Sequence, residues 1–217
     1  METEIIAVTQ QKGGVGKSTI AMHLGAAFHE KEKKVLLVDA DGQNTLIRWS
    51  STAKSGILFP VVNLAEAGAQ IHREIKKFIN DYDFIIVDCP PSITEKISGV
   101  VLLAASIAVV PISSSPADYW SSVGLVKLIL QAQTMNKALQ AVFLLNKTDK
   151  RRMLTRELKR PLEKLGFPLL KTQIPTRECY KQAMALGKTV LQMSDRSAQL
   201  AGAEIRACAN EIAALLK

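Results

Sequence analysis

The sequence predicts an α/β protein with three layers, in which a mostly parallel, twisted sheet of about seven or eight strands carries helices on both faces. Short β-branched runs alternate with longer stretches of helical periodicity, which is typical of parallel strands joined by crossover helices. Several strand-like runs are apolar almost throughout, as expected when helices cover both faces of a strand. With 217 residues, of which 47% are hydrophobic, the chain suits one compact domain, and we expect residues 1–217 to form it.

The individual elements follow from residue type and hydrophobic period. Apolar, β-branched runs predict strands at 4–9, 34–40, 57–64, 83–89, 106–112, 139–146 and 167–174. The patterns between them predict helices at 17–31, 45–54, 66–80, 94–104, 117–136, 152–165, 177–186 and 196–216. Pro161 interrupts one of these helices, which we therefore expect to be kinked or split. The last helix is expected to pack on the sheet, because it carries apolar residues at roughly helical spacing: Leu200, Ile205, Ala209, Ile212 and Leu216.

The composition excludes several classes of protein. The start "METEIIAV" carries acids where a signal peptide carries basic residues, and the longest apolar run, 99–112, is too short to span a bilayer. We therefore expect a soluble, cytoplasmic protein. Cys89, Cys179 and Cys208 are scattered and lack the C-x-x-C spacing, so they indicate buried, inert thiols rather than disulfides or a zinc site.

Positive charge is concentrated in one segment. The formal net charge is +8, and residues 147–171 hold nine Lys and Arg against three Asp and Glu, a local excess of +6. A concentrated basic segment favours a polyanionic partner, although an ordinary solvated basic helix has the same composition.

The stretch "QQKGGVGKST", residues 10–19, departs at one position from the phosphate-loop pattern G-x-x-x-x-G-K-[ST], because Gln11 stands where the pattern has glycine. Glycines after a strand let backbone N–H groups surround phosphate oxygens, and the following helix adds its positive dipole end. The alternative interpretation is a glycine-rich turn without a nucleotide site. We predict a nucleotide site formed by Gly13, Gly14, Val15, Gly16, Lys17, Ser18 and Thr19, with Lys17 on the β- and γ-phosphates and Ser18 on Mg²⁺.

Three aspartates follow later strands. Asp39 and Asp41 end the run "VLLVDAD", and Asp88 ends "DFIIVD". A single aspartate at a strand end is commonly a turn former or helix cap. Beside a phosphate loop, such aspartates indicate a site for Mg²⁺, which prefers oxygen ligands and water.

These segments together resemble the ParA/MinD superfamily of deviant Walker A ATPases. Residues 12–19 resemble its Walker A box, in which a signature lysine, here Lys12, precedes two glycines. "DADGQN" is similar to the Walker A' segment, with Gly42 in place of the usual proline, and "IIVDCPPS" to Walker B and switch II. "SSSPADYW" and "TLIRWSS" resemble the small plasmid-partition branch without an N-terminal DNA-reading domain, and "TQIPTRECYKQAMALGKTVLQ" resembles the closing Ile-Pro segment.

The resemblance implies roles for individual residues. In an ATP-sandwich dimer, Lys12 would contact the phosphates of the partner's nucleotide. Asp41 would position the attacking water, and Asp88 would lie near Mg²⁺, so the implied catalytic set is Lys12, Lys17, Asp41 and Asp88. The implied metal set is Ser18, Asp41 and Asp88. The adenine would lie against Asn146, Pro175 and Thr176.

The resemblance also implies partners. A partition ATPase forms a homodimer with ATP and Mg²⁺, binds double-stranded DNA non-specifically on the nucleoid, and hydrolyses ATP slowly until a ParB-like or cargo-adaptor protein stimulates it. The basic segment supplies the predicted phosphate contacts: Lys150, Arg151, Arg152, Arg156, Lys159 and Arg160. Four further basic residues could extend this surface: Lys181, Lys188, Arg196 and Arg206.

Three alternatives to DNA partition remain. One is a positioning ATPase whose cargo is a protein assembly. A second is a MinD-like membrane ATPase, which the small, nearly neutral tail "ACANEIAALLK" disfavours, because such a protein needs a basic amphipathic helix with large apolar residues. A third is an iron–sulfur reductase or scaffold, which would need a cysteine partner for Cys89.

Overall fold

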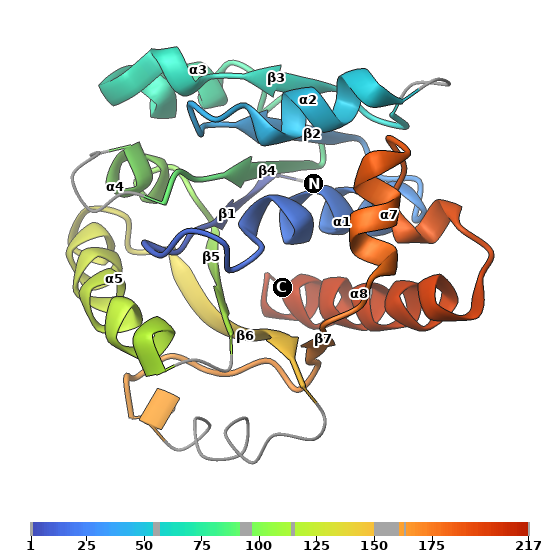
Figure 1. Ribbon diagram of the computed structural model, residues 1–217. Helices are drawn as coiled ribbons and strands as arrows, with labels where there is room; N and C mark the ends of the chain where they lie inside the picture. Colours follow the sequence, from blue (N-terminus) through green and yellow to red (C-terminus); the bar gives the residue numbers. More distant parts are fainter. Residues whose placement is uncertain are drawn as a thin grey trace.

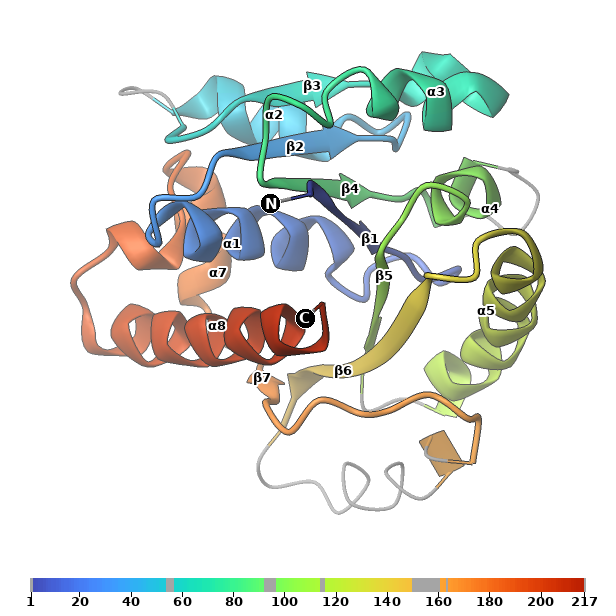
Figure 2. The same ribbon diagram turned by 180° about the vertical axis from the view of Figure 1, so that it is seen from behind.

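The computed structural model describes residues 2–53, 57–91, 97–113, 116–149, 161–162 and 164–216, with the backbone alone for 116–121. It contains a parallel sheet of seven strands in the order β3-β2-β4-β1-β5-β6-β7 (Figures 1 and 2). The strands are β1 (Glu4–Val8), β2 (Val35–Asp39), β3 (Val61–Asn63), β4 (Phe84–Asp88), β5 (Ile107–Ile112), β6 (Gln140–Thr148) and β7 (Ile174–Pro175). The predicted fold class is confirmed.

Helices cover both faces of this sheet (Figure 1). They are α1 (Lys17–His29), α2 (Thr45–Thr52), α3 (Ile71–Lys76), α4 (Ile97–Leu102), α5 (Pro116–Met135), α7 (Cys179–Ala185) and α8 (Arg196–Leu215). Short 3-10 segments occupy Ala65–Gln70 and Val190–Gln192.

The sheet divides the core into two halves, and alternate side chains of each strand enter one half or the other. Ile6 and Val8 of β1 face the half that contains α1, α2, α7 and α8, while Ile5 and Ala7 face the half that contains α3, α4 and α5. Successive side chains of a strand point to opposite faces, so a strand with helices on both sides must be apolar at every position. The continuous apolar runs in the sequence have this cause.

Three predicted elements are shorter than expected. The strand expected at 57–64 is only β3, Val61–Asn63, at the sheet edge. The strand expected at 167–174 is reduced to β7 and an isolated bridge between Phe143 and Leu169. The helix expected at 66–80 is replaced by a 3-10 segment, Ala65–Gln70, which is kinked at Gly68, followed by the short helix α3. Of the helix expected at 152–165, only Pro161, Leu162, Lys164 and Leu165 are described, and the rest lies outside the described residues.

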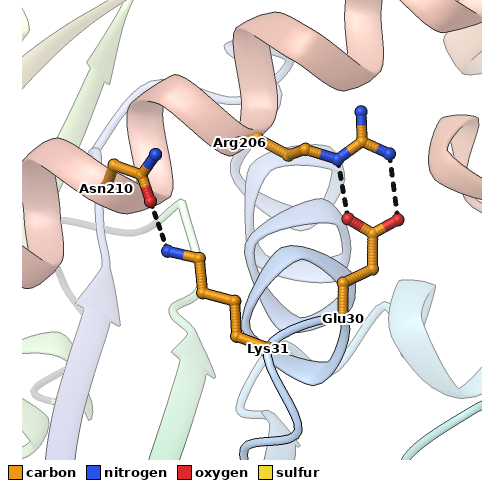
Figure 3. A network of polar contacts seen from close by, with 4 residues as sticks. All are labelled: Glu30, Lys31, Arg206 and Asn210. Atoms are coloured by element: carbon orange, nitrogen blue, oxygen red, sulfur yellow. Dashed lines mark hydrogen bonds and ion pairs between the residues drawn. The ribbon is translucent and has the colours of Figure 1, made fainter.

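Helix α8 packs against α1 and β7, and its buried side chains share one apolar cluster with β1, on the face of the sheet that α1 covers. Ile205, Ala209 and Ile212 are buried, whereas Leu200 is 49% exposed and lies outside the apolar contact. Polar contacts at the end of α1 add to this packing (Figure 3). They consist of two hydrogen bonds from Arg206 to the Glu30 carboxylate, at 2.7 and 3.0 Å, and a hydrogen bond from Lys31 to Asn210.

The connection after α7 is tied to α1 and α2. The buried His23 of α1 accepts a hydrogen bond at Nε2 from the Val190 N–H, at 3.1 Å. Its Nδ1 must therefore carry the proton that is donated to the Thr19 carbonyl, at 2.7 Å. Burial lowers the pKa of His23 to about 4, so the ring is neutral near pH 7. Trp49 of α2 donates to the Lys188 carbonyl at 3.0 Å.

The substitution Gly187→Ala tests how closely the connection after α7 is packed against α2. A Cβ atom at Gly187 would lie 2.3 Å from the backbone nitrogen of Ala53, and the residue has φ +61°. Gly68→Ala is the matched control, because its φ is +50° but no atom lies within 4 Å of its Cβ position. Gly68→Ala should lower the free energy of unfolding by about 1–3 kcal/mol. Gly187→Ala should lower it by about 2 kcal/mol more, because backbone atoms must also move.

Urea denaturation of both variants measures this difference. Equal losses of unfolding free energy would contradict a close approach of residue 187 to α2.

Candidate active site

The phosphate loop and two aspartates meet at the carboxyl edge of the sheet. β4 lies between β1 and β2, and its last residue, Asp88, is in register with Val8 on one side and Asp39 on the other. The loop of residues 9–16 leaves the end of β1 and enters α1. The sequence prediction that these motifs share one edge is therefore correct for the loop, Asp39 and Asp88.

The loop requires glycine at two positions. Gly14 and Gly16 have φ values of +77° and +92°, in the region that glycine adopts without steric cost. A Cβ atom at Gly16 would also lie 2.5 Å from the Nδ2 atom of Asn146. Gly16 is the N-cap of α1, so the unpaired N–H groups of the first turn and the helix dipole face an incoming anion.

Lys17 is buried at the start of α1, with 7% of its surface exposed. Its ammonium donates to the Lys12 carbonyl at 3.4 Å. Burial lowers the pKa of Lys17, and the negative charges of Asp88 and Asp41 act in the opposite direction. Phosphate oxygens would supply the acceptors and the negative charge that a buried ammonium requires.

Gln11, the residue that departs from the phosphate-loop pattern, faces α5. Its Oε1 atom lies 2.9 Å from the position that a Cβ atom of Gly124 would occupy. The neighbouring Gln10 is buried, donates to the Ser122 hydroxyl at 3.1 Å and accepts from the Gln11 N–H at 2.9 Å. Both glutamines therefore anchor the start of the loop to α5. Sequence reasoning missed this contact, because nothing in the local pattern pairs residues that lie more than 100 positions apart.

Asp88 has the environment of a metal-binding carboxylate. It is fully buried, and within the described part of the chain neither oxygen accepts a hydrogen bond of normal geometry. Burial, together with the charges of Asp39 and Asp41, raises the pKa of Asp88 to about 7, while the nearby Ser18 hydroxyl and Lys17 favour the ionised form. Unpaired carboxylate oxygens beside a hydroxyl fit Mg²⁺, which is commonly held by one or two protein oxygens together with water and phosphate. Ser18 and Asp88 would hold the ion.

Asp39 and Asp41 have different surroundings. Asp39 is buried and accepts hydrogen bonds from the backbone N–H groups of Asp41, Leu46 and Ile47, at 3.2, 2.9 and 3.2 Å. Its carboxylate therefore caps the first turn of α2 and holds the preceding turn. This is the turn-forming and helix-capping role that is common for a single aspartate at a strand end. Asp41 is half-buried; its carboxylate accepts the Gln43 N–H through Oδ1, at 3.0 Å, and its backbone carbonyl accepts the Asn44 N–H, at 2.9 Å. It lies at the tip of the turn that Asp39 holds.

The residues predicted to line the base lie on the other side of the loop. Asn146 is buried, and its amide nitrogen is directed to the Val15 carbonyl, at 2.7 Å. Pro175 belongs to β7, and the Thr176 N–H donates to the Thr148 carbonyl at 3.0 Å. Asn146, Pro175 and Thr176 thus lie close together at the ends of β6 and β7, and their contact with adenine stays a prediction.

The six residues predicted to bind DNA lie outside the described residues: Lys150, Arg151, Arg152, Arg156, Lys159 and Arg160. Of the four considered as extensions, Arg206 is engaged with Glu30, and Lys181 is paired with Glu178 at 2.9 Å. Lys188 and Arg196 are exposed. A cation held by a carboxylate is a weaker phosphate ligand, so Arg206 and Lys181 are less available for DNA contact, and their part in the DNA surface stays a prediction.

The cysteines are buried and unpaired, as predicted. Burial raises the pKa of Cys89 and of Cys208 to about 12, which leaves both thiols protonated and unreactive near pH 7. Within the described residues, no helix has the length and apolar character needed to cross a membrane.

The parallel sheet, the glycine loop that enters α1 and the aspartate at the neighbouring strand end define a phosphate-loop nucleotide-binding protein. A family model described as the CobQ/CobB/MinD/ParA nucleotide binding domain matches residues 6–190. The chain therefore belongs to this family, as its sequence motifs indicated.

Individual relatives agree with this assignment. Maintenance of carboxysome distribution protein A of Halothiobacillus neapolitanus is 32% identical over 207 residues, and 95% of each chain is covered. Sporulation initiation inhibitor protein Soj of Bacillus subtilis is 27% identical over 246 residues, with 93% of this chain and 94% of the relative covered. The structure of cobyrinic acid a,c-diamide synthase from Mycobacterium smegmatis with bound ADP and magnesium has a TM-score of 0.73 at 23% identity, covering 97% and 94% of the two chains. This last likeness shows the shared fold.

Asp88→Asn tests whether a buried, unpaired carboxyl destabilises the ligand-free protein. The folded pKa of about 7 lies above the unfolded value of about 3.9, so the folded state binds more protons between these pH values. The free energy of unfolding should therefore fall as the pH rises from about 4 to about 7. The Asn variant cannot ionise, so at about pH 8 in EDTA it should be more stable than the wild type, on the order of 1 kcal/mol or more.

Urea denaturation at several pH values, without nucleotide, measures the effect. Asp81→Asn, at an exposed position before β4, controls for the loss of one negative charge. A stability difference between wild type and Asp88→Asn that does not change with pH would contradict this account of Asp88.

Proposed function

We propose that this chain is a single-domain ParA-type ATPase, spanning residues 1–217, that forms a dimer with MgATP and positions a cargo on the nucleoid. The observation that carries the proposal is the deviant phosphate loop, with buried Lys17 and unpaired Asp88 beside it, in a chain 32% identical over 95% of its length to a carboxysome distribution protein. The ATP-bound dimer binds DNA without sequence preference, and partner-stimulated hydrolysis releases it.

The chemistry of the site divides between holding the phosphates and orienting water. Backbone N–H groups of the loop and the Lys17 ammonium bind the β- and γ-phosphates and stabilise the charge that develops on them during transfer. Asp88 and Ser18 would hold Mg²⁺, which would neutralise phosphate charge. Asp41, at the exposed tip of its turn, orients the attacking water, and Lys12 contacts the phosphates bound by the other subunit. Dimerisation is thereby coupled to the γ-phosphate.

The relatives bear on the class of cargo. Two proteins for the maintenance of carboxysome distribution match at 32% and 29% identity, and Soj proteins of Bacillus subtilis and Thermus thermophilus match at 27% and 26%. These figures favour a protein assembly as cargo, which the sequence motifs left as an alternative to plasmid or chromosomal DNA. The neighbouring gene separates the two classes. A gene for a large assembly supports positioning, and a small DNA-binding protein beside a repeated site supports partition.

The other two alternatives receive less support. Among the described residues, no group of three or more His, Cys, Asp or Glu side chains is arranged to hold a metal, and Cys89 is buried, which disfavours an iron–sulfur role. The structural likeness to the MinC:MinD complex of Aquifex aeolicus, at 21% identity, concerns the fold and not the membrane.

Two substitutions separate ATP binding from ATP turnover. Lys17→Ala removes the buried ammonium and should abolish detectable ATP binding, because the loop then lacks its principal charge for the phosphates. Asp41→Ala leaves the loop intact, so it should bind ATP, lose turnover by about 100-fold or more and remain dimeric. Calorimetry, phosphate release and sizing chromatography with ATP measure these three properties. Normal turnover by Asp41→Ala would refute the assignment of the water-positioning residue.

The predicted DNA surface is tested by salt dependence. Replacing Arg152 and Arg156 with alanine removes two phosphate contacts, so the slope of log K against log salt should fall by about two. Fluorescence anisotropy with duplex DNA of two unrelated sequences, with and without ATP, measures this. Lys33→Ala together with Lys34→Ala, directly before the amino end of β2, is the charge-matched control. An unchanged slope would place the DNA surface elsewhere.

A further inference from the structure

Two consecutive side chains at the end of β6 contact the phosphate loop. Asn146 donates from Nδ2 to the Val15 carbonyl at 2.7 Å, and Lys147 donates from Nζ to the Gly14 carbonyl at 2.6 Å. Consecutive side chains of a regular strand point to opposite faces of the sheet. A regular β6 would therefore present only one of these two residues to the loop.

An irregularity at Lys147 brings both side chains to the same side. The register between β6 and β7 shifts between Asn146 and Thr148, and Lys147 has φ +52°. A lysine seldom adopts a positive φ, and a bulge in a strand commonly redirects a side chain at a functional site. A strained backbone persists only where its surroundings hold it, and here the contact with Gly14 lies at the strained residue.

The two contacts orient the N–H groups of the loop. In a trans peptide, the carbonyl and the N–H of the same unit point in opposite directions, and the described chain has no cis peptide bond. Since β6 holds the carbonyls of Gly14 and Val15, the N–H groups of Val15 and Gly16 point away from β6. Successive N–H groups of this kind form the concave site with which a phosphate loop binds phosphate.

We propose that Asn146 and Lys147, the β6 strap, are positioning residues that hold the phosphate loop in its binding conformation, and that their effect acts on the phosphate chain whatever the base. The proposal deepens the proposed function and rests on it, because the loop must bind a nucleotide for the strap to matter. It also explains the glycine at position 16, where a Cβ atom would meet the strap at 2.5 Å from Asn146.

Variants of Lys147 test whether the β6 strap contributes to the affinity for phosphate. Lys147→Met removes the charge and should weaken binding of MgATP and of inorganic tripolyphosphate with Mg²⁺ by the same factor, about tenfold, as expected for one charge-assisted hydrogen bond. Lys147→Gly relieves the backbone strain and also removes the ammonium, so it should show the same loss. Lys147→Arg should retain most of the affinity. Competition against a fluorescent ATP analogue gives each affinity, with Lys171→Met, at an exposed lysine, as control.

Asn146→Ala separates the strap from a base contact. If Asn146 acts through the loop, the variant loses affinity for MgATP and for tripolyphosphate alike. A loss confined to MgATP would show that Asn146 contacts the base and would overturn its place in the strap. Wild-type affinity of the Lys147 variants for both ligands would overturn the role of Lys147.

Hydrogen exchange tests the strap without a ligand. In Lys147→Met, the amides of residues 11–17 should exchange several-fold faster than in the wild type, while urea denaturation shows unchanged global stability. Unchanged exchange would refute the strap. A wild-type chain that binds neither MgATP nor tripolyphosphate would refute the proposed nucleotide function, and the exchange experiment would still decide whether the strap orders the loop.

Discussion

Parallel pairing of β1 with both β4 and β5 is the constraint from which the site follows. Parallel neighbours must be connected by crossovers, and helices supply those described between β1 and β6, so these strands deliver their carboxyl ends to the same edge. In-register pairing then places Asp88 of β4 beside the end of β1, where the phosphate loop begins. The same edge receives the end of β6, whose side chains contact that loop. The loop, Asp88 and the side chains of Asn146 and Lys147 are thus brought together by one hydrogen-bonding pattern.

The site concentrates charge that the ligand-free fold does not fully compensate. Lys17 and Asp88 are both buried. Burial lowers the pKa of Lys17 and raises the pKa of Asp88, and thereby favours the uncharged form of each group. Desolvated groups of this kind lower stability, and phosphate and Mg²⁺ restore the interactions that burial removed. A bound nucleotide would therefore stabilise the folded protein.

The surroundings of the site are correspondingly well packed. Asp39 holds the turn that carries Asp41, Gln10 joins the loop to α5, and His23 joins the first turns of α1 to the segment after α7. Helix α8 packs on the same face of the sheet as α1, through apolar contacts and through the ion pair of Arg206 with Glu30. The contacts of Gln10 and His23 join the loop and α1 to segments more than 100 residues away along the chain.

The sequence by itself determined the fold class, the phosphate loop and the strand-end aspartates, because apolar period, glycine spacing and the G-K-S triplet are local properties. The local pattern could not separate Asp39 from Asp88, since both end apolar strands; only the family resemblance placed Asp88 near Mg²⁺ and gave Asp39 no role. Only the tertiary structure gave Asp39 three backbone donors and left Asp88 without a partner among the described residues. It also decided the contacts of Gln11 with α5, Arg206 with Glu30 and Lys147 with Gly14. Those contacts join distant segments, and their geometry depends on how the strands and helices pack, which no local pattern encodes.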